Sequence, residues 1–153
     1  MKDVVGLSMP VAFLIENCRT SGASDEVIVR CMRERDFSPI LNDVVEPSMD
    51  FAERMAVAEE IGEPWEEAVR FGYRFKFLHF NGVKRLLRFR FGKQADRDYK
   101  PDGLQIEDLS LTAEEAETLR SLIRTQWDVV DVPSEGTNRQ VKIRPRYGGA
   151  GKE

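Results

Sequence analysis

The side chains best suited to chemistry gather between residues 69 and 95, where cations and aromatic rings interleave. This segment carries eight basic side chains and no acidic one. Cations attract the phosphates of a nucleic acid and flat rings stack on its bases, so the combination is typical of nucleic-acid binding. The aromatic residues concerned are Phe71, Tyr73, Phe75, Phe77, Phe80, Phe89 and Phe91. The sequence therefore predicts a non-enzymatic accessory or regulatory protein that contacts nucleic acid through residues 70–93.

Two local structures fit this segment and place its cations differently. In the first, a hairpin turns at Phe80-Asn81-Gly82, and the pairing of its strands gathers the aromatic side chains on one face. In the second, residues 83–91 form a helix that ends at Gly92, with Lys84 and Arg88 still aligned four residues apart. We favour the hairpin, because it buries one face and leaves the opposite face to the cations. The predicted contact surface consists of Arg74, Lys76, Lys84, Arg88 and Arg90.

The distribution of charge supports a second hypothesis. Residues 1–68 carry 6 basic and 15 acidic side chains, although the whole chain has a net charge of only −4. In this alternative the protein is an adaptor or inhibitor that binds a protein partner, either through its acidic helices or by docking its basic face on an acidic partner. A third interpretation is purely structural: the aromatic rings form the core, and the cations balance the acidic helices of the same chain.

Few residues are suited to catalysis or to metal binding. His79 is the only histidine and has no nucleophile beside it in the sequence. Cys18 and Cys31 lack the spacing of metal ligands, and we predict that both are small core residues on helices. The acidic residues of 96–107 imitate a calcium loop, but Lys100 stands where an oxygen ligand belongs. We therefore expect no enzyme activity, no cofactor and no metal site.

Capping residues mark where helices are expected to begin. We predict three N-terminal helices that follow the capping residues Ser8, Ser24 and Ser48. Thr112-Ala113-Glu114-Glu115 has the pattern of a capping box, which predicts a further helix over 113–125.

Alternating apolar residues indicate strands in the C-terminal half. Strands are expected over 104–111, with a register slip near 107–108, and over 127–132 and 140–144. Runs of helix followed by runs of strand favour an α+β fold over an alternating α/β fold. We therefore predict an N-terminal helical part of about three helices, followed by a small, mostly antiparallel sheet with one packed helix.

The length of the chain suits one domain of about 150 residues. We predict a single domain over 1–153, with an acidic helical subregion over 1–62, a basic and aromatic α+β subregion over 63–146 and a flexible tail over 147–153. The longest apolar stretch, over 4–15, is shorter than the ~20 residues that cross a bilayer, and its spacing is helical. We therefore expect a cytoplasmic protein with no membrane partner.

Overall fold

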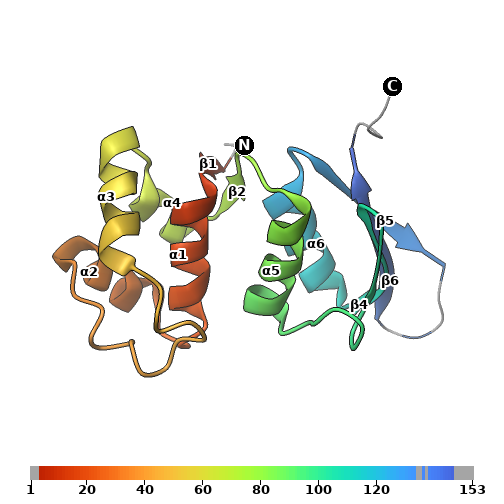
Figure 1. Ribbon diagram of the computed structural model, residues 1–153, viewed down its shortest axis with the longest axis horizontal. Coiled ribbons are helices and arrows are strands. Elements are labelled where there is room, and N and C mark those ends of the chain that lie inside the picture. The colour runs from red at the N-terminus through yellow and green to blue at the C-terminus, as the bar shows by residue number, and fades with distance from the viewer. Residues whose placement is uncertain (1–3, 134–135, 137, 147–153) are drawn as a thin grey trace. The chain divides into compact units, whose positions relative to one another are not determined.

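The computed structural model describes residues 4–133, 136 and 138–146 (Figure 1). Its elements confirm the predicted α+β class, with helices first and a small antiparallel sheet after them. The chain divides into two compact units, which we call unit 1 (residues 1–76) and unit 2 (residues 77–153). The basic segment is therefore split between them. The single domain with its subregions stays a prediction, and the predicted tail over 147–153 lies outside the described residues.

The described residues of unit 1 form four helices and a two-stranded parallel sheet. Its first strand lies beside its last, so that Val5 is opposite Tyr73 and Leu7 is opposite Phe75. Leu7 and Phe75 are both at most 1% exposed, which makes this pair of strands part of the core. The elements are β1 (Val5–Leu7), α1 (Met9–Arg19), α2 (Asp25–Glu34), α3 (Phe51–Ile61), α4 (Trp65–Phe71) and β2 (Tyr73–Phe75).

Two of these helices begin at a residue whose side chain accepts a hydrogen bond from an N–H group of the first turn. The Ser24 hydroxyl accepts a hydrogen bond from the Val27 N–H at 3.3 Å and caps α2 as predicted. The predicted start of α3 at Ser48 is wrong. Asp50 takes the capping position, because its carboxylate reaches the Glu53 N–H at 3.0 Å.

Polar side chains of α1 tie other parts of unit 1 to the core. Asn17 is fully buried. Its amide donates to the carbonyl oxygen of Glu46 at 2.9 Å and accepts from the Glu46 N–H at 3.0 Å. The buried Glu16 carboxylate accepts a hydrogen bond from the Tyr73 hydroxyl. The irregular segment before α3 and the strand β2 are thereby both fixed to α1.

In unit 2, the residues that the structure describes form a four-stranded antiparallel sheet in the order β3-β4-β6-β5, together with two helices. The predicted capping box is confirmed. The Thr112 hydroxyl accepts from the Glu115 N–H, and the Glu115 carboxylate accepts from the Thr112 N–H, both at 3.0 Å. The elements are α5 (Phe80–Phe91), β3 (Lys100–Asp102), β4 (Gln105–Leu111), α6 (Ala113–Ile123), β5 (Trp127–Val132) and β6 (Arg139–Pro145).

Strand β4 carries the predicted register slip. Ile106 pairs with Ile143 and Leu109 pairs with Val141, and the register shifts between these two pairs. Asp108, inside the irregularity, has a positive φ of 61°. The slip keeps both Ile106 and Leu109 fully buried, although three positions along a regular strand would point to opposite faces.

The favoured hairpin is wrong, and the helical alternative is confirmed. His79 caps α5, because its Nδ1 accepts a hydrogen bond from the Gly82 N–H at 2.9 Å. Gly82 lies in the first turn of the helix, where a Cβ would come within 2.5 Å of Leu78 Cδ1. Gly92 ends the helix in the left-handed conformation, with φ 67°. Asn81-Gly82 therefore serves close packing at a helix start and not a strand turn.

Burial explains why the helix forms. Val83, Leu86 and Leu87 are all fully buried. They lie on one side of a helix, whereas a strand would divide them between its two faces. The other arm of the expected hairpin does form a short strand over 73–75, but its partner is β1.

Candidate functional site

The five predicted contact residues are divided between the two units. Unit 1 contains Arg74, on β2, and Lys76, directly after it. Unit 2 contains the other three on α5: Lys84, Arg88 and Arg90. Lys84 and Arg88 line the same concavity, at the four-residue spacing of one helix face. A surface shared by residues of different units stays a prediction.

Lys76 balances a buried carboxylate of its own unit. Its Nζ lies 2.8 Å from Oε2 of Glu63, whose side chain is fully buried. The same carboxylate accepts hydrogen bonds from the N–H and the hydroxyl of Ser8, both at 2.9 Å. Ser8 is the N-cap of α1, so Glu63 places its negative charge at the positive end of that helix. Lys76 therefore has a structural role in unit 1.

Arg74 lies along β1. It is opposite Gly6 in the parallel sheet, and a Cβ at Gly6 would lie 2.6 Å from Arg74 Nη1. This nitrogen is buried and has no hydrogen-bond partner among the described residues. The guanidinium therefore lies over the backbone of β1 at Gly6, where a Cβ would displace it.

Arg90 lies on a different side of α5 from Arg88. At ~100° per residue, the two side chains leave the helix about 160° apart. Arg90 falls between the directions of Leu86 and Leu87, which are fully buried. Arg90 was predicted as a contact residue because the hairpin placed it on the same face as the other cations, and the helix does not place it there.

The exposed side of α5 and the segment after it form a concavity of about 330 Å³ in unit 2. Hydrogen bonds shape this segment: the Asp98 carboxylate accepts from the Gln94 N–H at 2.7 Å, and the Asp96 N–H donates to the Tyr99 carbonyl at 2.8 Å. We call the site the basic concavity. Its lining residues are Lys84, Arg85, Arg88, Lys93, Gln94, Ala95 and Tyr99.

Aromatic rings of α5 lie against the cations of the basic concavity. The Lys84 ammonium is 5.4 Å from the centre of the Phe80 ring. The guanidinium carbons of Arg85 and Arg88 are 5.3 Å and 5.1 Å from the centre of the Phe89 ring. A ring face attracts a cation while leaving its formal charge in place. These contacts therefore help to position the cations along α5.

The carboxylate of Asp98 lies next to the basic concavity, where Arg97 and the Gln94 N–H hold it. Asp98 forms an ion pair with Arg97 at 2.7 Å, and Arg97 holds the pKa of Asp98 below its usual range. Burial, followed by the negative charges of Asp96 and Asp98, raises the pKa of Tyr99. The phenol therefore stays protonated at neutral pH, which suits a hydrogen-bond donor for an anion.

The sequence reasoning did not select Arg85, Lys93 or Tyr99. The hairpin placed Arg85 on the aromatic face, whereas the helix places it one residue after Lys84 and three before Arg88. The signal that identifies it is Gly92: a glycine stop after residue 91 favours a helix, and helical spacing then makes Arg85 a neighbour of Arg88, three residues later. Nothing local in the sequence indicates that Lys93 and Tyr99 line the same concavity.

The residues most suited to covalent chemistry are engaged in the fold or buried in it. His79 caps α5 through Nδ1. Cys18 and Cys31 are buried, as predicted for core residues. Burial raises the pKa of the Cys18 thiol to about 12 and raises that of Cys31 as well. Both thiols are therefore protonated, and poor nucleophiles, at neutral pH.

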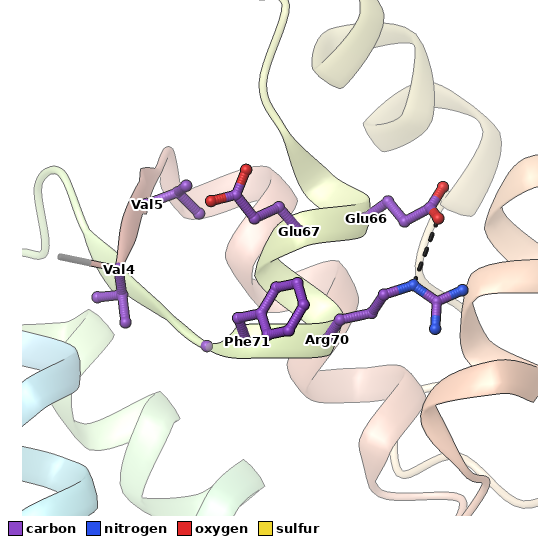
Figure 2. Close-up of a pocket in the computed structure, with 7 residues that line it drawn as sticks. Val4, Val5, Glu66, Glu67, Arg70 and Phe71 are labelled. Atoms are coloured by element: carbon purple, nitrogen blue, oxygen red, sulfur yellow. Dashed lines mark hydrogen bonds and ion pairs between the residues drawn. The ribbon is translucent and has the colours of Figure 1, made fainter. Parts of the chain in front are cut away.

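A larger cavity, of about 640 Å³, lies in unit 1 beside α4 and the start of β1 (Figure 2). Val4, Val5 and Phe71 supply its apolar lining, and the Phe71 side chain is 74% exposed. Glu66 and Arg70 also line it and form an ion pair at 3.3 Å. The cavity therefore suits an apolar group.

The described residues contain no group of three or more His, Cys, Asp or Glu side chains that could hold a metal ion. In the same part of the chain, every helix is too short or too polar to cross a membrane. Comparison with protein-family models, curated proteins and solved structures finds no match. The function must therefore be inferred from the side chains themselves.

Proposed function

We propose that the protein is a non-enzymatic accessory or regulatory protein that binds nucleic acid through the basic concavity. The observation that carries this proposal is that four cationic side chains from two segments line one concavity: Lys84, Arg85, Arg88 and Lys93. Four cationic side chains around one concavity attract an anion. Phosphate groups are the anions that a nucleic acid presents at high density.

The charge of the two units supports the same location. Residues 77–153 contain 14 basic and 12 acidic side chains, a net charge of +2. Residues 1–76 contain 9 basic and 15 acidic side chains, a net charge of −6. A polyanion is therefore attracted to unit 2 and repelled by unit 1, which favours a single basic contact site.

The surroundings of the nucleophilic residues support a binding protein over an enzyme. Acid–base catalysis needs a titratable group that reaches substrate. His79 uses Nδ1 to cap α5, and the thiols of Cys18 and Cys31 are buried. The basic concavity contains cations and a protonated phenol, which bind anions without activating a nucleophile.

Fluorescence anisotropy with a labelled oligonucleotide tests the proposal. Lys84→Glu/Arg88→Glu should weaken binding at least ~10-fold and reduce the slope of log K against log salt, by ~0.7–0.9 for each lost phosphate contact. The double change should leave the circular dichroism spectrum unaltered, because Lys84 and Arg88 are not in the core.

A matched variant controls for net charge. Lys100→Glu/Arg144→Glu makes the same change in charge in the same unit, at an exposed cation on β3 and another on β6. This control should retain most of the affinity. Equal losses in the two double variants would mean that binding follows net charge alone, and would contradict a specific site.

A second candidate function is a protein-interaction module, which Phe71 favours. Its ring is 74% exposed beside the 640 Å³ cavity of the acidic unit 1. Exposed rings next to an apolar cavity are common at protein interfaces. A stoichiometric partner that survives nuclease treatment, and is lost in Phe71→Ser but kept in the control Ile61→Ser, would favour this candidate. Ile61 is 50% exposed on α3, outside the cavity lining.

A further inference from the structure

We infer that the basic concavity selects single-stranded nucleic acid, with one backbone phosphate in the concavity and bases on the rings at the two ends of α5. This inference rests on the proposed function. It specifies which form of nucleic acid binds and which aromatic residues contribute.

The shape of the site disfavours a duplex. A helix that reads duplex DNA enters the major groove, which is about 12 Å wide, and its side chains project from a convex surface. Lys84, Arg85 and Arg88 instead line a concavity, whose other wall comes from residues 93–99. Its volume of about 330 Å³ lies near the lower end of small-ligand sites, ~300–1,000 Å³. A flexible single strand can place one phosphate in this shallow concavity and bring its unpaired bases to nearby rings, whereas the bases of a duplex are stacked inside it and cannot reach them.

Aromatic rings continue the cationic stripe at both ends of α5. Phe80 lies four residues before Lys84, and Phe91 lies three residues after Arg88. All of these side chains therefore leave the helix on one face. The Phe80 and Phe91 residues are half-buried, so neither is enclosed in the core. Trp127 supports Phe80, with ring centres 6.1 Å apart.

The spacing of the rings suits a strand that passes along the helix. At 1.5 Å rise per residue, Phe80 and Phe91 lie about 16 Å apart along the axis of α5. Lys84 and Arg88 lie between them, so the order along the helix is ring, cation, cation, ring. Stacking rings on either side of a cationic track are typical of proteins that bind single strands without reading the sequence.

Anisotropy measurements with matched substrates test this inference. A labelled oligonucleotide of ~12 nucleotides, within the usual site size of ~4–16, is compared as a single strand and as a duplex of the same sequence. The single strand should bind at least ~10-fold more tightly. Phe91→Leu should weaken single-strand binding by about 10-fold, because a base loses its stacking partner, and should not weaken duplex binding. Phe80→Leu repeats the test at the other ring.

Controls separate stacking and phosphate binding from general effects. Leu104→Ala truncates another exposed apolar side chain of unit 2, 59% exposed, and should change neither affinity. Lys84→Met should reduce the salt slope for the single strand by ~0.7, the value of one phosphate contact. Inorganic phosphate should displace the oligonucleotide only in large molar excess.

The outcomes distinguish this inference from the proposed function. Equal affinity for duplex and single strand, or no effect of either ring variant, would overturn the single-strand preference while nucleic-acid binding stands. Displacement by equimolar inorganic phosphate would also overturn it, because the concavity would then be a site for free phosphate. If the wild-type protein binds neither substrate, the proposed function fails together with the inference.

Discussion

Replacing Lys76 with methionine tests the buried ion pair of unit 1. Lys76→Met removes the ammonium but keeps the apolar stem, and it leaves the Glu63 carboxylate with its hydrogen bonds from Ser8. Two charges 4 Å apart attract by about 4 kcal/mol at an effective dielectric constant of about 20, and by about 1 kcal/mol in water. The Lys76 side chain is 55% exposed and that of Glu63 is fully buried, so the pair lies between these limits. We expect Lys76→Met to lower the unfolding free energy of unit 1 by about 2 kcal/mol.

Amide hydrogen exchange in α1 and α3 measures the stability of unit 1 separately from that of unit 2. A double-mutant cycle adds Glu63→Gln and the combined variant. Each single change should destabilise unit 1. The combined variant should lose about 1–2 kcal/mol less unfolding free energy than the two single variants lose together, because either single change already removes the interaction.

An exposed ion pair of the same unit provides the control. Arg35 and Glu59 lie 2.7 Å apart, but their side chains are 37% and 67% exposed. Water screens such a pair, so its coupling energy should stay below ~1 kcal/mol. A coupling of less than ~0.5 kcal/mol for Glu63 and Lys76, the usual error of additivity, would refute the claim that Lys76 balances Glu63.

Three further changes have definite expected outcomes. Asn17→Leu should lower the unfolding free energy by about 2–3 kcal/mol in urea titrations, because both backbone polar groups of Glu46 lose their partner; an unchanged midpoint would contradict this. Thr112→Ala removes the cap of α6 and should cost about 1 kcal/mol in the same assay, with earlier exchange of the first-turn amides. The Cys18 thiol has a pKa of about 12 in the fold against 9.0 for the free group, so its stabilising contribution is complete below pH 9.0 and is lost as the pH rises toward 12. The unfolding free energy should therefore decline above pH 9.0, and it should decline less steeply in Cys18→Ala than in the wild-type protein. Equal slopes in the two proteins would contradict this role of the Cys18 thiol.

Local signals in the sequence predicted most of the elements. The capping box before α6 and the cap of α2 depend on residues three positions apart, and both are present in the structure. The slip in β4 was predicted because Ile106 and Leu109 are out of phase for a regular strand. β1 was not predicted, because three residues carry too little pattern and their partner β2 lies far along the chain.

The candidate site was predicted in its location but not in its geometry. The aromatic residues over 71–77 recur at every second position, and Asn81-Gly82 often forms a strand turn, so both favoured a hairpin. The deciding fact is the burial of Leu86 and Leu87, which depends on what packs against α5 and cannot be read from neighbouring residues. Lys84 and Arg88 lie on the same face in either structure, because four-residue spacing aligns them in a helix as well. Arg90 lies on a different side of the helix, because it is only two residues after Arg88.

The parallel pairing of β1 with β2 also constrains how the chain folds as it is made. Val5 and Tyr73 are separated by 68 positions, and closing a loop of that length costs on the order of 4 kcal/mol of chain entropy before any contact offsets it. During synthesis, β1 leaves the ribosome before β2 and has no strand partner until β2 follows, so the helices between them can form before the sheet does. The same pairing brings the first and last strands of unit 1 side by side, running in the same direction. A circular permutant of unit 1 that connects β2 back to β1 through a short linker, and opens the chain in the segment between α2 and α3, would keep these strands paired while changing the order in which they are made.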